Sequence, residues 1–560
     1  MKTIFKFVLF LFLTGCIGIT GTADLILIGG KVYTLDSENS IVQALAIKDG
    51  KILALGGDDE ISRYIGENSS VIDLEGKTVT PGFIDSHGHL FYTGSALLSL
   101  DLSVVANYEE LVAKVAESVE NVEPGQWVIG TGWHQEKWDP PPEVMVSGFP
   151  THDLLSAASP DNPVFLNHAS GHAVLVNAKA MEIAGVDENT EPPEGGTIIK
   201  DGDGQPTGVF TENAMNLLRP FLPSGSESMS DAMEAALTQC VRNGITSFHD
   251  ASINRPMLDA LKGLRNRGEL KVRVYAMLSV GSDGGDPELV EEYFAAGPDT
   301  DPFLTVRTIK MFSDGALGSR GAWLLSEYDD DPGNTGQNTT PMETMAQWAG
   351  QAAAAGFQTA VHAIGDRANR EVLNVFEETA QQYPDMDHRF RIEHAQHLSA
   401  QDIPRFGELG VIASMQAIHM ASDISWAIDR LGPERIEEGA YVWQKLMQSG
   451  ALVTNGTDTP VEPVDPITNF YAAVTRRTRD GELFAWSHPE QAFSRREALK
   501  AYTQNPAYAS FNEDKLGSIE PGKLADLTVF SQDLLTVPEN EIRDTEVEYT
   551  IVNGEVVYQK

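Results

Sequence analysis

Cysteine is almost absent from this 560-residue sequence, which contains only Cys16 and Cys240. Cys240 lies in the helix-like stretch 235–242 and is interpreted as a small buried hydrophobic residue. If Cys16 is modified, as argued below, no internal disulfide can form. The fold must then rest on its hydrophobic core, which a chain of this length with 42% hydrophobic residues easily forms.

Basic residues are also scarce. The sequence has 40 Lys and Arg against 81 Asp and Glu, which gives a formal net charge of -41. Phosphate contacts need clustered Lys and Arg, so this balance argues against nucleic-acid binding. We interpret the acidic surplus as a solvated surface that aids solubility.

The N-terminal apolar run, Phe7–Leu13, is too short to span a bilayer as a permanent helix. It follows Lys2 and Lys6, as in a secretory signal peptide, and it leads into Leu13-Thr-Gly-Cys16, which resembles a bacterial lipobox. We therefore predict a lipoprotein signal peptide over residues 1–15 and a lipid anchor at Cys16 in the bacterial cell envelope, outside the cytoplasmic membrane. The alternative is a plain signal peptide cut near Ala23, which would give a secreted protein.

Both ends of the remaining chain have the same β character. Short strand-like runs separated by glycine-containing turns fill residues 24–78, and similar runs fill residues 515–560, where Asn553-Gly554 is a hairpin signal. We predict that these two segments form one β-sandwich domain. The middle of the chain must then close upon itself before the chain returns.

The middle, residues 79–514, predicts a (β/α)8 TIM barrel, because apolar strand-like runs recur and helix-like stretches follow them. The eight runs are those ending at His87 and those at 244–249, 271–278, 304–312, 356–362, 389–394, 411–416 and 451–455. The insertion at 95–235, after the first strand, is far longer than a loop. It leaves the end of the barrel where active sites lie, so we predict a lid; the alternative is a structural decoration of the rim.

The first candidate site is His87-Gly88-His89. Side chains two residues apart on an extended strand point to the same side, so this pair could hold one metal ion. Alone the pattern is weak, but other barrel strands also end in residues that could bind metal: Lys310, His362, His394 and Asp458. Because the strands of a barrel are parallel, these side chains should converge at one end.

These motifs resemble those of the amidohydrolase superfamily, and more narrowly its YtcJ-like or amidohydrolase-3 branch, which includes N-substituted formamide deformylases. The resemblance rests on the order of the candidate ligands and on the segments 78–89, 309–320, 362–369 and 455–460. It covers nearly all of residues 24–560. It implies a metal-dependent hydrolase acting on a carbon–nitrogen bond, with a small-molecule amide as its substrate.

The resemblance also implies the ligands of two divalent ions, most simply zinc. His87, His89 and Asp458 would hold the first ion, and His362 and His394 the second. Lys310 would bridge them; because an ammonium cannot ligate a cation, it must be neutral or, as the resemblance implies, N6-carboxylated. The alternative for Lys310 is a packed side chain with its amine at the rim. Asp458 would also act as the general base and acid.

Three further residues are expected near the substrate. The resemblance makes His172 a substrate or carbonyl contact, Trp133 is expected to line the pocket from the insertion, and Arg320 is a weaker candidate. Three alternatives to the amidohydrolase stay open: a deaminase, a dipeptidase-like enzyme, and a surface lipoprotein that binds without catalysis. A homodimer is left open as well.

Overall fold

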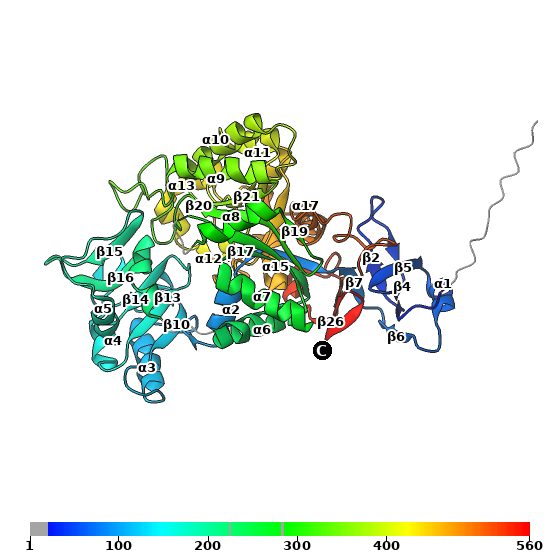
Figure 1. Ribbon diagram of the computed structural model, residues 1–560, viewed down its shortest axis with the longest axis horizontal. Coiled ribbons are helices and arrows are strands. Elements are labelled where there is room, and N and C mark those ends of the chain that lie inside the picture. The colour runs from blue at the N-terminus through cyan, green and yellow to red at the C-terminus, as the bar shows by residue number, and fades with distance from the viewer. Residues whose placement is uncertain (1–20, 223–225, 282–284) are drawn as a thin grey trace, which may run out of the picture.

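The computed structural model describes residues 21–222, 226–281 and 285–560, so the expected signal peptide and Cys16 lie outside the described residues. The described chain has three parts (Figure 1). A barrel lies at the centre, a unit made from the insertion lies at one end, and a strand-rich unit containing both ends of the described chain lies at the other. No helix in these described ranges is long and apolar enough to cross a membrane.

The predicted barrel is confirmed: eight strands pair in parallel in the order β24-β23-β22-β21-β20-β18-β17-β8. Their bounds are β8 (Phe83–Gly88), β17 (Ile245–Ile253), β18 (Arg273–Ser279), β20 (Leu304–Phe312), β21 (Gln358–Ala363), β22 (Arg391–His394), β23 (Ile412–Met415) and β24 (Val453–Asn455). No backbone ladder joins β24 to β8. The gap is bridged just beyond the strands, where the Asp458 amide donates to the His87 carbonyl at 2.8 Å and Thr457 donates to the Asp85 carboxylate at 2.6 Å.

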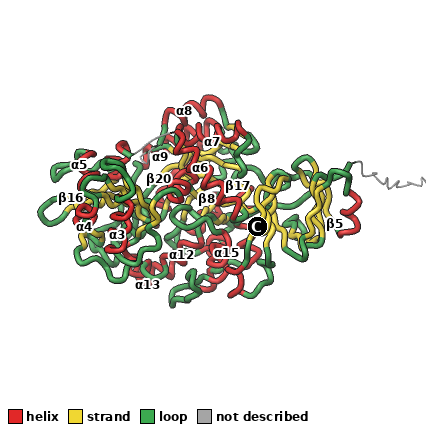
Figure 2. Tube along the Cα trace, turned by 90° about the horizontal axis from the view of Figure 1, so that it is seen from below, coloured by secondary structure: helices red, strands yellow, loops and turns green. Residues whose placement is uncertain are grey.

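Helices surround this barrel (Figure 2). Helix α7 (Arg255–Arg267) shows why they form: the Asn254 side chain caps its first turn, Gly268 ends it at φ 72°, and Leu258, Leu261 and Leu264 bury one face. The others are α2 (Leu90–Leu97), α6 (Ser226–Arg242), α8 (Pro287–Ala296), α9 (Met342–Ala355), α10 (Asp366–Gln382), α11 (Ile403–Leu409), α12 (Ala417–Asp423), α13 (Ala427–Gly439), α14 (Trp443–Gln448), α15 (Pro466–Thr475), α16 (Arg495–Ala501) and α17 (Gln504–Ala509).

The two ends of the described chain share one sheet, because β7 pairs antiparallel with β25. That sheet has the order β27-β26-β25-β7-β2-β3, and a second sheet, β5-β4-β1-β6, packs on it through a common hydrophobic core. The strands are β1 (Leu25–Ile28), β2 (Lys31–Tyr33), β3 (Ile41–Val42), β4 (Ala44–Lys48), β5 (Lys51–Gly56), β6 (Ser70–Asp73), β7 (Thr78–Pro81), β25 (Leu527–Phe530), β26 (Val547–Val552) and β27 (Glu555–Gln559).

The insertion has a six-stranded mixed sheet of its own, in the order β15-β16-β14-β13-β10-β9. Its strands are β9 (Leu100–Asp101), β10 (Val128–Trp133), β13 (Val164–His168), β14 (Ala173–Val176), β15 (Gly196–Lys200) and β16 (Pro206–Glu212), flanked by α3 (Tyr108–Val119), α4 (Asp153–Ala158) and α5 (Ala178–Ala184). Two hydrophobic clusters form its core. These clusters are separate from the large hydrophobic cluster of the barrel, so the insertion packs around a core of its own.

Candidate functional site

His87 lies near the end of β8, where acidic residues face both of its ring nitrogens. The side chain is fully buried. Nδ1 lies 2.5 Å from Oε2 of Glu393 on β22, and Arg391 donates to the other oxygen of that carboxylate at 2.7 Å. A carboxylate at Nδ1 holds the proton there and leaves the Nε2 lone pair available. Nε2 lies 3.4 Å from Oδ1 of Asp458 and has no hydrogen-bond partner among the described residues.

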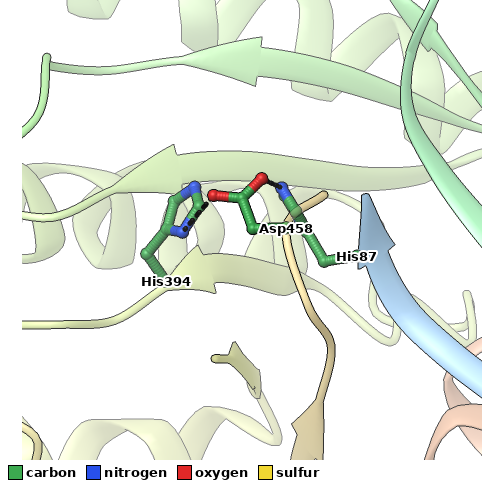
Figure 3. Close-up of side chains that lie close together, drawn as sticks. All are labelled: His87, His394 and Asp458. Atoms are coloured by element: carbon green, nitrogen blue, oxygen red, sulfur yellow. Dashed lines mark ion pairs between the residues drawn. The ribbon is translucent and has the colours of Figure 1, made fainter. Parts of the chain in front are cut away.

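Asp458 is the point on which the histidines converge. It follows β24 with φ 57°, a backbone conformation that non-glycine residues seldom adopt and that is often found at functional sites. Its Oδ1 lies 3.3 Å from Nε2 of His89, while its Oδ2 lies 3.9 Å from Nδ1 of His394 and 3.5 Å from Nε2 of His419. Figure 3 shows the Asp458 carboxylate between His87 and His394.

Burial and charge set the protonation of this cluster. Burial lowers the pKa of His89, and it lowers the pKa values of His362 and His394 well below the ordinary value. These imidazoles are therefore neutral at pH 7 and can offer lone pairs. For His87 burial acts in the same direction, but Glu393 and Asp458 outweigh it and raise the pKa. The raised pKa favours a second proton on the His87 ring, at Nε2, which faces Asp458. A cation between His87 and Asp458 would replace that second proton.

The donor set fits a divalent ion. One ligand atom each from His87, His394 and Asp458 can be chosen so that all three atoms lie within 4.8 Å of one another. Imidazole nitrogens with a carboxylate oxygen are ligands that suit zinc. The ring of His394 is also oriented from behind, since Nδ1 lies 2.7 Å from Oε1 of Gln416. A partner on one ring nitrogen is the arrangement that metal-binding histidines usually have.

Lys310 and His362 line the same cavity as His394 and Asp458. Lys310 is fully buried, with Nζ 3.4 Å from the Ala251 carbonyl and 4.1 Å from the centre of the Phe312 ring, so its amine does not lie at an exposed rim. His362 is the last residue but one of β21, and its Nε2 lies 3.4 Å from Oδ1 of Asp314. Burial raises the pKa of Asp314 to about 7, although three backbone amides donate to its carboxylate.

Two cavities meet at this cluster. The larger has a volume of about 1140 Å³ including its open mouth, and the smaller about 590 Å³. Both are lined by His172, His362, His394 and Asp458. His172 comes from the insertion, so the insertion forms part of the wall of the site, and the His172 ring lies 5.1 Å from that of His362. A substrate held at Asp458 would have room on two sides.

Trp133 and Arg320 lie elsewhere than the sequence suggested, since neither lines these two cavities. Trp133 is fully buried in the hydrophobic core of the insertion, where its indole nitrogen donates to the Leu166 carbonyl at 2.9 Å. Its large ring is used for packing, and the next residue, His134, lines the smaller cavity instead. The Arg320 guanidinium pairs with Asp330 at 3.0 Å, so its charge is already matched within the protein.

Sequence reasoning missed the acids that support the histidines, namely Glu393, Asp314 and Glu212. Glu393 lies 306 positions from its partner His87, so no local spacing could reveal the pair. A signal was present in Arg391-Ile-Glu-His394, where two charged residues alternate in a short strand that is buried on both faces. Such residues must be paired inside the barrel.

Comparisons with known proteins agree with this geometry. Residues 70–558 match the model of a family described as the amidohydrolase family. The putative amidohydrolase YtcJ of Bacillus subtilis is 32% identical over 544 residues, which cover 95% of this chain and 99% of that protein. The N-substituted formamide deformylase of Arthrobacter pascens is 27% identical over 556 residues, or 97% and 99% of the two chains. Among solved structures, an uncharacterized metal-dependent hydrolase from Pyrococcus horikoshii superposes with a TM-score of 0.74 at 29% identity, covering 92% of this chain and 99% of that one.

Proposed function

The chain belongs to the amidohydrolase family, and from that premise we propose that it is a metal-dependent hydrolase that cleaves the carbon–nitrogen bond of a small amide. The observation that carries the proposal is the position of His87, whose Nδ1 faces Glu393 while its Nε2 faces Asp458 without a hydrogen bond. A buried nitrogen oriented in this way is prepared to ligate a cation.

We assign two divalent ions, most simply zinc, to this site. His87, His89 and Asp458 would hold one ion, and His362 and His394 the other, with Lys310 as an N6-carboxylated bridge. Five of these six residues line one cavity, and the sixth, His87, lies close to His394 and Asp458, which supports this assignment. When bound, such ions supply a water of lowered pKa and a Lewis acid for the substrate carbonyl.

The protein's own groups would handle the proton. The pKa of Asp458 is held well below its ordinary value because, although burial opposes the charge, His87 and the other histidines outweigh that cost. Asp458 is thus ionised at pH 7 and able to accept a proton from the attacking water. It would return that proton to the leaving nitrogen. His172 would contact the substrate from the part of the cavity wall that the insertion forms.

Metal analysis combined with a substrate screen tests the proposal. We expect about two equivalents of zinc per chain, and turnover of an N-formyl, N-acyl or cyclic amide that stops when a chelator removes the metal. N-Formyl amides come first, because a deformylase of such compounds is among the relatives. Protein that takes up no metal after careful reconstitution would instead be a binding protein. Release of ammonia from an amine, or cleavage of dipeptides alone, would indicate the deaminase or the dipeptidase-like alternative.

Lys310 separates the two-ion site from a one-ion site. Because Lys310 is fully buried, replacement by Ala would leave a cavity, so Lys310→Met is the better test: it fills the space and cannot be carboxylated. We expect Lys310→Met to fold with nearly unchanged thermal stability, but to lose turnover and most of the bound metal. Full metal content and turnover in this variant would leave a one-ion site built on His87, His89 and Asp458.

We also propose, from the sequence alone, that Cys16 carries a lipid that anchors the protein outside the cytoplasmic membrane. Cys16→Ala should release the protein from the membrane fraction in soluble form. If the variant fractionates with membranes as before, Cys16 is not the anchor.

A further inference from the structure

We infer that Glu212 is a positioning residue of the active site, which acts by fixing the ring of His172 against the bound substrate. The inference rests on the proposed function, because it assigns a role in the same reaction. It makes the insertion part of the catalytic apparatus rather than only a cover. The contacts of Glu212, its backbone conformation and its surroundings each point to this role.

Glu212 holds His172 by two contacts. The backbone amide of Glu212 donates to the His172 carbonyl at 3.0 Å. The carboxylate oxygen Oε2 lies 2.7 Å from Nδ1 of the same histidine. One residue therefore holds both the backbone and the ring of His172, which fixes the ring's direction and places the shared proton at Nδ1.

The conformation of Glu212 is one that a side chain seldom adopts. It ends β16 with φ 51° and ψ -131°, which lies outside the regions that L-residues normally occupy. Such a conformation is strained and persists only where the surroundings fix it. This backbone conformation directs the Glu212 carboxylate out of the insertion and toward the barrel loop at 313–321.

Two glycines of that barrel loop make room for the carboxylate. A Cβ on Gly315 would lie 2.1 Å from Oε1 of Glu212, and a Cβ on Gly321 would lie 2.6 Å from the same atom. Oε1 has no hydrogen-bond partner among the described residues, although Glu212 is buried. A buried oxygen without a partner is costly, so packing alone does not explain why an acid lies here.

The position of His172 explains why an acid is needed at Glu212. His172 lines both cavities, while its loop is held from behind by Ser170, whose hydroxyl accepts from the His172 amide at 3.2 Å and contacts Nδ1 of His168 at 2.8 Å. Since Nδ1 of His172 is engaged with Glu212, a polar contact with a substrate would be made by the other ring nitrogen, Nε2. Without Glu212 the ring would lose its hydrogen bond at Nδ1.

A purely structural role would predict something different. If Glu212 only fastened the insertion to the barrel, its replacement would lower thermal stability and act independently of His172. If it positions His172, its loss should reduce turnover only while His172 is present. A double-mutant cycle distinguishes these roles.

The experiment compares metal-loaded Glu212→Gln, His172→Gln and the double variant with the wild type on one amide substrate. We expect Glu212→Gln to lower kcat about 10- to 100-fold, the range found when partners of site histidines are removed, with KM and metal content within about twofold. The double variant should be no slower than His172→Gln alone. Independent, multiplying losses, or a Glu212→Gln variant as fast as the wild type, would overturn the inference.

Matched variants complete the test. Gly315→Ala should reproduce the kinetic loss of Glu212→Gln, because its methyl group displaces Oε1. Glu182→Gln removes an acid that pairs with Lys179 at 2.9 Å on the surface of the insertion, and His152→Gln removes a histidine of the insertion that lies outside both cavities. Both of these should keep full activity. A loss in either control equal to that of Glu212→Gln would mean that the insertion is merely sensitive to change, and it would overturn the inference.

A spectroscopic readout keeps this inference separate from the proposed reaction. In protein labelled with 15N-histidine, the signals that disappear in His172→Gln belong to His172. We expect them to show a proton on Nδ1 in the wild type and to shift in Glu212→Gln. If the wild type hydrolyses no amide, the proposed function fails while this pairing can still be observed. Unchanged His172 signals in Glu212→Gln would overturn the pairing itself.

Discussion

Glu393 shows at the scale of single residues how the barrel orients a candidate metal ligand, His87. Arg391 donates to both of its oxygens, at 2.7 and 3.1 Å, so the carboxylate cannot turn away from His87. Although burial opposes the charge, Arg391 and His87 keep the pKa of Glu393 below its ordinary value. An ionised acid at Nδ1 makes the lone pair on Nε2 of His87 a stronger ligand for a metal ion.

We therefore predict that Glu393→Gln weakens metal binding about 10- to 100-fold, since the amide keeps the shape but loses the charge behind His87. Competition with a zinc chelator measures the change. Glu513→Gln, which alters an acid paired with Arg389 at 2.8 Å away from the site, is the matched control and should bind metal normally. Equal zinc affinity in both variants would show that Glu393 does not support the ligand.

Asp423 provides a prediction on pH. Burial raises the pKa of this carboxyl group from 3.8 to about 7, outweighing the hydrogen bonds donated by Tyr441 at 2.7 Å and Gln396 at 2.9 Å. Between about pH 4 and 7 the folded protein therefore keeps a proton that the unfolded chain has released. The contribution of Asp423 to stability is present at about pH 4 and is lost as the pH rises through about 7.

In Asp423→Asn this pH dependence should disappear. We expect the stability of the wild type relative to Asp423→Asn to fall steadily as the pH rises from about 4 to about 7. Urea unfolding of both proteins across this range measures the difference. A difference that stays constant with pH, or one that grows as the pH rises, would contradict the assigned protonation.

At the scale of residues, sequence reasoning finds a histidine or aspartate at a strand end but not its partner. The pairs of Asp458 with His87 and of Glu393 with His87 join distant strands, and they depend on how the barrel closes. Gly88 makes the same point. A Cβ at this position would lie 2.5 Å from the Phe248 ring, a contact between strands that the sequence does not reveal. Packing between β8 and β17 therefore requires this glycine.

At the scale of elements, the closure of the barrel depends on the turn after β24. A Cβ on Gly456 would lie 2.5 Å from the backbone nitrogen of His87 and 2.9 Å from the carbonyl oxygen of that residue. Only glycine lets this turn approach β8 closely enough for the Asp458 amide to reach the His87 carbonyl. The contact that closes the barrel and the position of the candidate ligands are thus the same feature.

Gly456→Ala should consequently destabilise the protein by about 1–3 kcal/mol and weaken metal binding, because the added methyl group pushes Asp458 away from His87. The control is Gly350→Ala in α9, where a Cβ would meet nothing within 4 Å and helix propensity favours alanine by about 0.5–1 kcal/mol. Thermal unfolding and zinc titration report both effects. Normal stability and metal affinity in Gly456→Ala would refute this account of the turn.

The predictability of the elements follows their local signals. All eight barrel strands were expected near their observed positions, since each is a short apolar run followed by a helix. The β26–β27 hairpin was also readable, because Asn553 and Gly554 both adopt positive φ, 53° and 78°. The insertion's sheet was not predicted: it combines parallel pairs between separated strands, such as β10 with β13, with antiparallel pairs such as β15 with β16.

At the scale of the whole molecule, the strand-rich unit and the barrel are joined at the N-terminal ends of β17 and β18. The Thr528 hydroxyl donates to the Gly244 carbonyl at 2.6 Å. Arg273, the first residue of β18, binds the Asp526 carboxylate through two contacts of 2.6 and 3.0 Å. Both side chains of this ion pair are nearly inaccessible, with 5% and 3% exposed. The two units should therefore unfold together.

We predict that Asp526→Ala lowers the free energy of unfolding by about 3–5 kcal/mol, because it leaves the Arg273 charge buried without its partner. The double variant Arg273→Met, Asp526→Leu should recover most of that loss, since a buried ion pair replaced by apolar side chains of similar size is often neutral. Asp24→Ala removes an exposed pair with Lys48 and should leave the unfolding midpoint unchanged.

Urea unfolding followed by tryptophan fluorescence and by zinc release should give one coincident transition for the wild type. Zinc release well before the fluorescence change in Asp526→Ala would show that the Arg273–Asp526 ion pair couples the two units. An Asp526→Ala variant as stable as the wild type would show that the barrel is stable without this ion pair.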